Sequence, residues 1–223
     1  MSSDSASLQA LVREVFACPD DVALAIATAA ADRAFDAGAV ILRQGDTPNE
    51  TYLMLLGRAR ALAFGRDGRV VVLQNFSPGD MFGSTAHPTG DASLADIVAL
   101  ERVRTATLLA ADFLRMMDRH SCIGLALSRM LLRQLRAATE RMVERTTLSA
   151  VGRVHAELLR LAELGDGYVI SPAPVLSLLA LDVQTTRETV SRAVNALERR
   201  GIVRRTSEAL TIIAPHRLED LIA

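Results

Sequence analysis

The chain has 223 residues, a mass of 24.0 kDa and a formal net charge of −1 at pH 7. This length can bury a sizeable core and predicts one large or two modest domains, of which we expect two. No apolar run approaches the ~20 residues that a membrane span needs, and the first ten residues lack the charged-then-apolar order of a signal peptide. The sequence therefore predicts a cytoplasmic protein with no membrane partner, and its net charge argues against a uniformly basic nucleic-acid binder.

Side chains for catalysis or metal binding are sparse. Cys18 and Cys122 are too few and too far apart for a disulfide framework or a four-thiolate site, so we interpret them as structural thiols. A redox role for Cys122, which follows the candidate N-cap Ser121, stays open. The four histidines are scattered and there is no Gly-Lys-Ser phosphate motif, so we expect neither an enzyme nor a metal site.

The N-terminal half changes from a helical to a β-type pattern. Residues 8–31 are Ala-rich, with Leu, Val and Ile at helical spacings, and predict a helical lead-in. From Ala34 onward, short β-type runs are broken at regular intervals by Gly, Asp-Gly and Pro-Gly-Asp turns. Such punctuation predicts a small antiparallel barrel or sandwich.

A long helical pattern follows Leu108. Apolar or small residues recur there at alternating spacings of four and three, at Gly124, Ser128, Leu131, Leu135, Ala138 and Met142. This heptad-type seam predicts a dimerisation helix over 121–146, with Leu131, Leu135 and Met142 against a second copy. Burial of the same face against the chain's own barrel is the alternative.

The C-terminal zone has the order helix, turn, helix, hairpin. Two helical segments meet near Gln184, Thr185 or Thr186 can cap the second of them, and Gly201 can close it. Two β-type runs around Ser207 then predict a hairpin. This order is typical of a winged helix-turn-helix.

The second of these helices carries side chains suited to reading base edges. Arg187, Glu188, Ser191 and Arg192 occupy its first two turns. Arginine contacts guanine through two hydrogen bonds and a glutamate accepts from the cytosine amino group, so Glu188 and Arg192 suit a G·C pair in the major groove. Between Gln184 and Thr206, six arginines stand against two glutamates, an excess that attracts phosphates. We expect Arg204 or Arg205, in the hairpin, to contact phosphates.

These residues carry a resemblance to a known family. The segment "TTRETVSRAVNALERRGIV" resembles the recognition helix of the CRP/FNR family of bacterial transcription regulators, most specifically over residues 186–192. "GDMFG" and "RQLRAATERM" resemble its sensor domain and dimerisation helix. The resemblance implies an α+β chain with a cyclic-nucleotide-binding-like antiparallel β-barrel over 1–120, a dimerisation helix over 121–146 and a winged helix-turn-helix over 147–223. It implies a homodimer on near-palindromic double-stranded DNA, with Thr186 in the DNA-binding segment and RNA polymerase as a further candidate partner. Gln184 stands where the family usually has a turn glycine, and would be strained if its backbone is left-handed.

The resemblance also places an effector pocket. It maps onto residues Phe82, Gly83, Ser84, Ser93, Leu94, Ala138 and Thr139. In members that bind cyclic AMP, the loop after "FG" supplies a Glu to the ribose and an Arg-Ser pair to the phosphate, and a Thr-Ser pair reads the adenine. Here Ser84, Ser93-Leu94 and Ala138-Thr139 stand at those places, and no Arg or Lys lies between Arg69 and Arg102. We therefore expect no dependence on cyclic AMP, and an effector that is unknown or absent.

Other sensor types have less support. The iron–sulfur type needs several N-terminal cysteines, and only Cys18 is present there. Haem would need an axial ligand, for which His87 is a candidate, although we expect no cofactor. The alternative function is a ligand- or haem-sensing module that acts through protein partners. The signal, the target genes, and activation or repression do not follow from the sequence.

Overall fold

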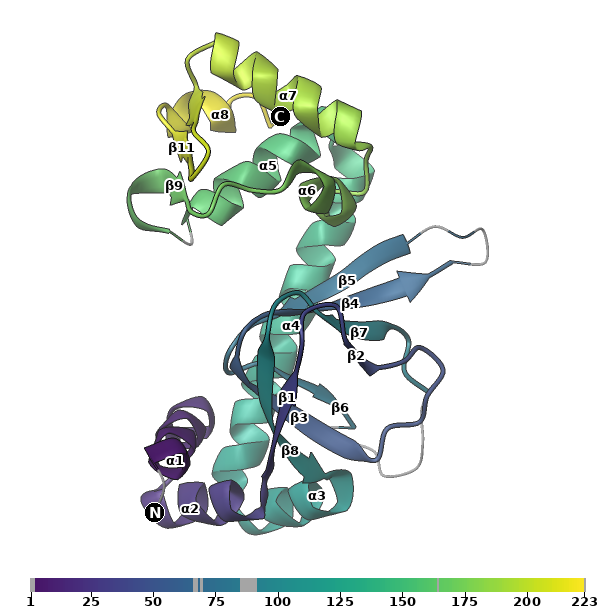
Figure 1. Cartoon of the computed structure of the whole chain (residues 1–223), viewed down its shortest axis with the longest axis vertical. Helices are drawn as coiled ribbons and strands as arrows, with labels where there is room; N and C mark the ends of the chain where they lie inside the picture. The colour runs from purple at the N-terminus through teal and green to yellow at the C-terminus, as the bar shows by residue number, and fades with distance from the viewer. Residues whose placement is uncertain (1–2, 66–67, 69, 85–91, 164, 223) are drawn as a thin grey trace. The chain divides into compact units, whose positions relative to one another are not determined.

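The computed structural model describes residues 3–65, 68, 70–84, 92–163 and 165–222. The chain forms two compact units, residues 1–138 and 139–223 (Figure 1). The dividing point lies inside α4 (Ser121–Thr147), the helix expected over 121–146. No helix among the described residues is long and apolar enough to cross a membrane.

Two helices open the first unit. α1 (Ser3–Phe16) and α2 (Asp20–Ala29) pack together through Val12, Phe16, Val22 and Ile26, all of them buried. The single lead-in expected over 8–31 is therefore interrupted. The break comes at Ala17, whose φ is 45°, and at Pro19, which is the N-cap of α2 and cannot donate a backbone hydrogen bond.

Two four-stranded antiparallel sheets follow. One has the order β1-β8-β3-β6 and the other the order β2-β7-β4-β5. Their bounds are β1 (Ala31–Phe35), β2 (Val40–Leu42), β3 (Glu50–Leu56), β4 (Ala59–Phe64), β5 (Val70–Phe76), β6 (Met81–Gly83), β7 (Asp96–Ala99) and β8 (Val103–Leu109). Buried side chains of both sheets, including those of Tyr52, Met54, Phe76 and Phe82, share one core. The sheets therefore form a roll.

The expectation of a barrel is corrected in one respect, because the roll is not closed. Among the described strands, no ladder pairs a strand of one sheet with a strand of the other. The chain instead crosses between the sheets at turns such as Gly57, between β3 and β4. Gly57 has φ +80°, and a Cβ on it would lie 2.3 Å from the backbone oxygen of Arg102. Only glycine combines this conformation with this close approach, so the crossing depends on that residue.

α4 packs one face on this roll. Its residues Ile123, Leu127 and Met130 belong to a core with Leu53 of β3 and Phe113 of α3 (Ala110–Arg119). The alternative to dimerisation, burial against the chain's own roll, therefore describes this face of α4. It does not describe Leu135, which is 64% exposed, and it describes Leu131 only in part, because that side chain is 46% exposed.

The second unit is a three-helix core with a small sheet. Its elements after α4 are α5 (Ala150–Glu163), η1 (Asp166–Tyr168), β9 (Val169–Ile170), α6 (Leu176–Asp182), α7 (Arg187–Arg199), β10 (Val203–Arg205), β11 (Leu210–Ile212) and α8 (Pro215–Glu219). The strands pair in the order β10-β11-β9. α5, α6 and α7 bury their apolar faces on one another, with Val154, Leu158, Leu179, Val190 and Val194 at the centre. The expected winged helix-turn-helix is present.

Candidate nucleic-acid interface

α7 begins at a side-chain cap and ends at a glycine. Thr186 is its N-cap, and the Thr186 hydroxyl oxygen accepts a hydrogen bond from the Thr189 backbone N–H at 3.2 Å. Of the two candidate threonines, Thr186 is therefore the cap. At the other end, Gly201 has φ +64° and follows Arg200, whose carbonyl accepts from the Arg217 guanidinium at 3.2 Å. Both ends of α7 are thus fixed by specific contacts.

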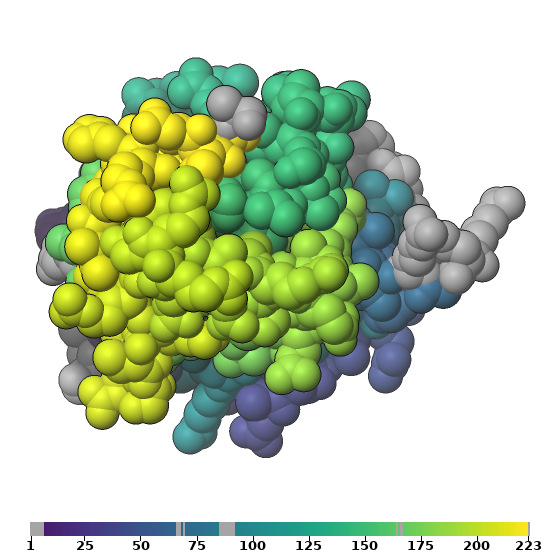
Figure 2. All heavy atoms as spheres, turned by 90° about the horizontal axis from the view of Figure 1, so that it is seen from above, coloured from purple at the N-terminus to yellow at the C-terminus, as the bar shows by residue number. Residues whose placement is uncertain are grey.

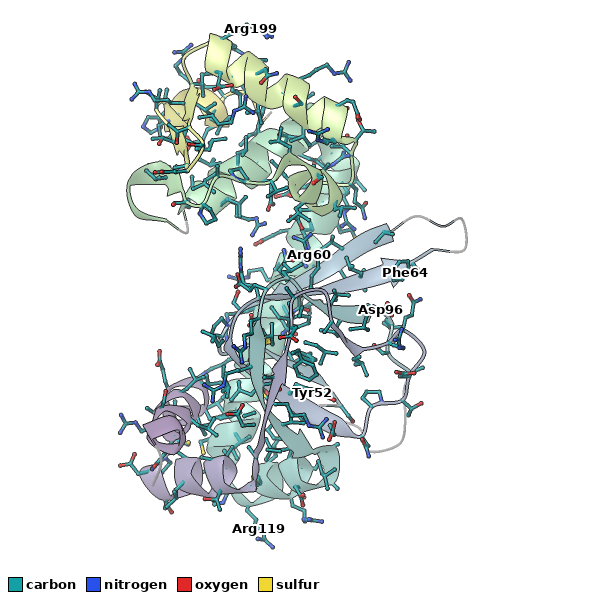
Figure 3. The ribbon with its side chains drawn as sticks, viewed as in Figure 1. Tyr52, Arg60, Phe64, Asp96, Arg119 and Arg199 are labelled. Carbon is teal, nitrogen blue, oxygen red and sulfur yellow. The ribbon has the colours of Figure 1, made fainter. Side chains whose placement is uncertain are left out.

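The polar side of α7 faces solvent. Arg187, Glu188 and Arg192 are exposed, and Ser191 is half-buried. Residues at the intervening positions are buried in the core of the unit: Val190, Ala193, Val194 and Leu197. Figure 2 looks onto this unit and shows the residues of α7 running across its exposed face. Arg199 stands at the end of α7 remote from the turn (Figure 3). The expected base-reading side chains therefore share one accessible helix face.

Glu188 lies in the first turn of α7, and the pKa of its carboxyl is below the usual value. A hydrogen bond from its own backbone N–H lowers the pKa of the Glu188 carboxyl, with further lowering by the Thr186 hydroxyl and by Arg187 and Arg192. No ion pair joins Glu188 to Arg192, both of which the structure describes, and the guanidinium of Arg192 lies 3.5 Å from the Thr189 hydroxyl. A carboxylate acceptor and a guanidinium donor are thus presented side by side without neutralising each other.

The two hairpin arginines differ in their surroundings. The Arg205 guanidinium donates to Asn195 Oδ1 at 3.1 Å and to Glu198 Oε2 at 3.0 Å, both on α7. It therefore fastens the hairpin to α7. Arg204 is exposed and stays the prediction for a phosphate contact. No local pattern pointed to this role of Arg205, because Asn195 and Glu198 belong to another element.

A cavity of about 230 Å³ lies in the first unit, between the roll and α4. Seven of its nine described lining residues are apolar residues or glycine, and the other two, Gln74 and Gln134, contribute side-chain amides. The lining residues that the structure describes are Gln74, Phe76, Met81, Phe82, Gly83, Leu127, Met130, Leu131 and Gln134. Behind it, the Tyr52 ring stacks on Phe82 with centroids 4.9 Å apart (Tyr52 is labelled in Figure 3). None of these described lining residues therefore carries a charged side chain.

Of the seven residues expected in an effector pocket, Phe82 and Gly83 line this cavity. Leu94 is 80% exposed, and the Ser93 hydroxyl donates to the Ala95 carbonyl at 2.7 Å. The remaining three are Ser84, whose backbone N–H donates to the Glu50 carbonyl, and Ala138 and Thr139, both exposed on α4. His87, the candidate haem ligand, lies outside the described residues. Across the described ranges, no three His, Cys, Asp or Glu side chains are grouped for a metal ion.

α4 also presents an exposed apolar face, which we call the seam. Leu131 is 46% exposed, Leu135 64% and Met142 68%, although these residues have the spacing of a buried heptad face. Leu131 additionally lines the cavity. Exposed leucines repeated along one helix are typical of a surface that is covered by a partner.

Comparisons with known proteins agree with this architecture. Residues 32–120 match the family model of the cyclic nucleotide-binding domain, and residues 152–221 match that of the Crp-like helix-turn-helix domain. The Cyclic AMP receptor protein of Thermus thermophilus is 30% identical over 176 residues, which cover 77% of this chain and 79% of the relative.

Two solved structures are also similar. FixK2 from Bradyrhizobium japonicum has a TM-score of 0.76 at 21% identity, over 87% of this chain and 98% of that chain. A transcriptional regulator of the CRP/FNR family from Thermus thermophilus has a TM-score of 0.66 at 25% identity, over 86% and 98%. The first likeness shows the fold alone. With both domain models and the 30% identical relative, however, the assignment is clear: this chain belongs to the CRP/FNR family of DNA-binding transcription regulators, which are not enzymes.

Proposed function

We propose that the protein is a homodimer that reads a near-palindromic DNA site, with Glu188 and Arg192 of each α7 on the base edges of one half-site. The supporting observation is the exposed carboxylate and guanidinium on one turn of α7. In the major groove, Arg192 donates to guanine O6 and N7, while Glu188 accepts from a cytosine amino group. Arg204 contacts a phosphate and sets register without reading sequence.

Dimerisation through the seam provides the two-fold symmetry of this proposal. A helix-turn-helix dimer binds two half-sites about one helical turn apart, so its site mirrors the protein's symmetry. The exposed leucines of α4 supply an apolar surface that a second copy would cover in a parallel helix pair. We expect the protein to act in the cytoplasm, where it would meet DNA. RNA polymerase is a candidate protein partner.

We further propose that cyclic AMP does not switch this protein, although one relative is named as a receptor for it. A cyclic phosphate in the cavity would lack the charge-assisted hydrogen bond of an arginine, which contributes about 1.5–3 kcal/mol. That difference corresponds to roughly 10- to 150-fold in affinity. The lining of apolar groups and two amides instead suits a small uncharged effector. Operation without a haem cofactor is part of the same proposal.

Selection of bound sites from random DNA tests the proposal, followed by affinity measurements over a range of salt concentration. We expect a two-fold symmetric site with a G·C pair in each half, and a steep fall of affinity with salt because phosphate contacts release counterions. The competing function, control of a protein partner through the helix-turn-helix, would give no enriched site and no such slope.

A further inference from the structure

Arg153, on α5, reaches across the second unit to the turn that precedes α7. We infer that Arg153 is a positioning residue, which holds this turn in the conformation that α7 needs to read bases and ties it to the residue that follows α4. The inference rests on the proposed reading of DNA by α7. Nothing in the sequence pattern of α5 singles out this arginine.

The Arg153 guanidinium donates to three backbone carbonyls on two separate segments. Nε donates to the Val183 oxygen at 3.0 Å and Nη2 to the Gln184 oxygen at 3.3 Å, both in the turn between α6 and α7. Nη1 donates to the Leu148 oxygen at 3.0 Å, in the connection between α4 and α5. A planar guanidinium presents its N–H groups along different edges, whereas a lysine ammonium is a compact point charge. The contact set therefore requires arginine.

The turn needs such support for two reasons. Gln184 has φ +51°, and the left-handed conformation is disfavoured by roughly 1–2 kcal/mol for a residue with a Cβ. In addition, the last carbonyls of a helix have no donor within the helix, and the C-terminus of α6 carries partial negative charge. The Arg153 cation satisfies the carbonyls of Val183 and Gln184 and complements that charge. It therefore stabilises a strained turn at the end where a cation is favourable.

This turn sets the start of α7. Thr185 donates its backbone N–H to the Ala180 oxygen at 2.9 Å, and Thr186 is the N-cap, two residues before Glu188. A shift of the turn would move Glu188 and Arg192 relative to base edges, where hydrogen-bond geometry is demanding. Phosphate contacts tolerate the same shift better, because charge attraction depends weakly on direction. Loss of Arg153 should thus reduce discrimination between sequences more than affinity for random DNA.

The test compares Arg153→Met with Arg160→Met, a matched control on the same helix. Arg160 pairs with Glu157, whose side chain is 11% exposed, so its removal also destabilises the unit. Its guanidinium interacts with the charge of Asp182 at the end of α6, but the three hydrogen bonds from Arg153 to backbone carbonyls stay in place in this control. The ratio of affinities for the selected site and for random DNA is measured at a temperature where each variant is folded by circular dichroism. We expect Arg153→Met to lower this ratio about tenfold or more, since several hydrogen bonds to a charged donor are lost. Arg160→Met should change it by less than about twofold.

A second substitution tests the mechanism. Gly adopts the left-handed conformation without strain, so Gln184→Gly in the Arg153→Met background should restore at least half of the lost discrimination on a logarithmic scale. The inference is overturned if Arg153→Met keeps the parent ratio while folded, or if Arg160→Met loses as much. If Arg153→Met does not fold, Arg153→Lys is measured in its place, because it keeps the charge without the three hydrogen bonds to separate carbonyls. An affinity ratio equal to that of the parent would then contradict the inference.

A measurement without DNA separates this inference from the proposed function. Hydrogen exchange of the Thr185 amide reports the turn directly, and we expect it to accelerate in Arg153→Met while amides in the middle of α5 keep their protection. A parent protein that selects no DNA site would refute the proposed function. Unchanged protection of Thr185 would refute the role of Arg153, whatever the DNA result.

Discussion

Replacing Leu135 by glutamate tests the seam on α4. Leu135 is 64% exposed in the single chain, so the change should alter the stability of a monomer little. Complete burial of a leucine contributes about 1.5–3 kcal/mol, so covering the exposed part contributes about 1–2 kcal/mol per subunit. In a dimer, each carboxylate would also face its twin near the two-fold axis, and desolvation of each ion costs several kcal/mol.

Together these effects exceed about 5 kcal/mol per dimer, which raises the dimer dissociation constant more than about 1,000-fold. Sedimentation velocity at micromolar protein should show monomers of Leu135→Glu and dimers of the parent. Leu24→Glu, on α2 at a residue 43% exposed, makes the same chemical change away from the seam and should remain dimeric. A Leu135→Glu protein that sediments as a dimer and binds DNA with parent affinity would refute the assignment of the seam.

Three further predictions concern DNA, the effector and pH. Arg192→Ala should reduce the free energy of binding to the selected site by about 1–3 kcal/mol and relax the preference at one G·C pair. Arg204→Ala should instead weaken binding to all sequences alike. If Arg192→Ala loses the same affinity for selected and for random DNA, Arg192 does not read a base. Cyclic AMP titrated by calorimetry should bind weakly and leave DNA affinity unchanged; micromolar binding with a tenfold gain in DNA affinity would contradict the effector proposal. Burial, with a smaller effect of Arg200, lowers the pKa of His155 below its usual 6.5. As the pH falls, the unfolded chain therefore binds a proton at this histidine before the folded chain does. The free energy of unfolding should then decrease as the pH drops below about 6.5. Chemical denaturation should show a smaller difference in the free energy of unfolding between pH 7 and pH 5 for His155→Leu than for the parent. Equal differences would show that another group causes the loss of stability in acid.

Local patterns in the sequence predicted the helix-turn-helix and the hairpin of the second unit, but not α8 or the contacts of Arg205. Capping by Thr186, closure by Gly201 and the hairpin around Ser207 are all short-range features, because each depends on residues within a few positions of one another. The exposed grouping of Glu188 and Arg192 follows from helical spacing alone once α7 is placed. The strain expected at Gln184 is likewise a local property, and its φ of +51° shows that its backbone is in the left-handed conformation.

The pairing of strands that are far apart in the sequence could not be predicted from local patterns. Turn residues predicted an antiparallel β structure, but which strands pair across the chain decides between a closed barrel and a roll, and the roll has two separate sheets. The predicted helical segment at the N-terminus divides into two helices because Ala17 and Pro19 interrupt it. The spacing of apolar residues over the whole segment does not show where such a break occurs. The cavity between the roll and α4 is lined by residues from several elements, so Gln74 and Gln134 had no common sequence signal.

Local sequence patterns alone predict the helix-turn-helix order and the cap and polar face of α7, and the sequence also shows that no Arg or Lys lies between Arg69 and Arg102. The contacts of the individual arginine side chains, in contrast, become visible only in the folded chain. Arg205 is held by Asn195 and Glu198, and Arg153 by three carbonyls of two distant segments, while Arg192 is presented to solvent. The physical reason is that a charge acts on what lies within a few ångströms of it in space, and those neighbours come from parts of the chain that no local pattern connects.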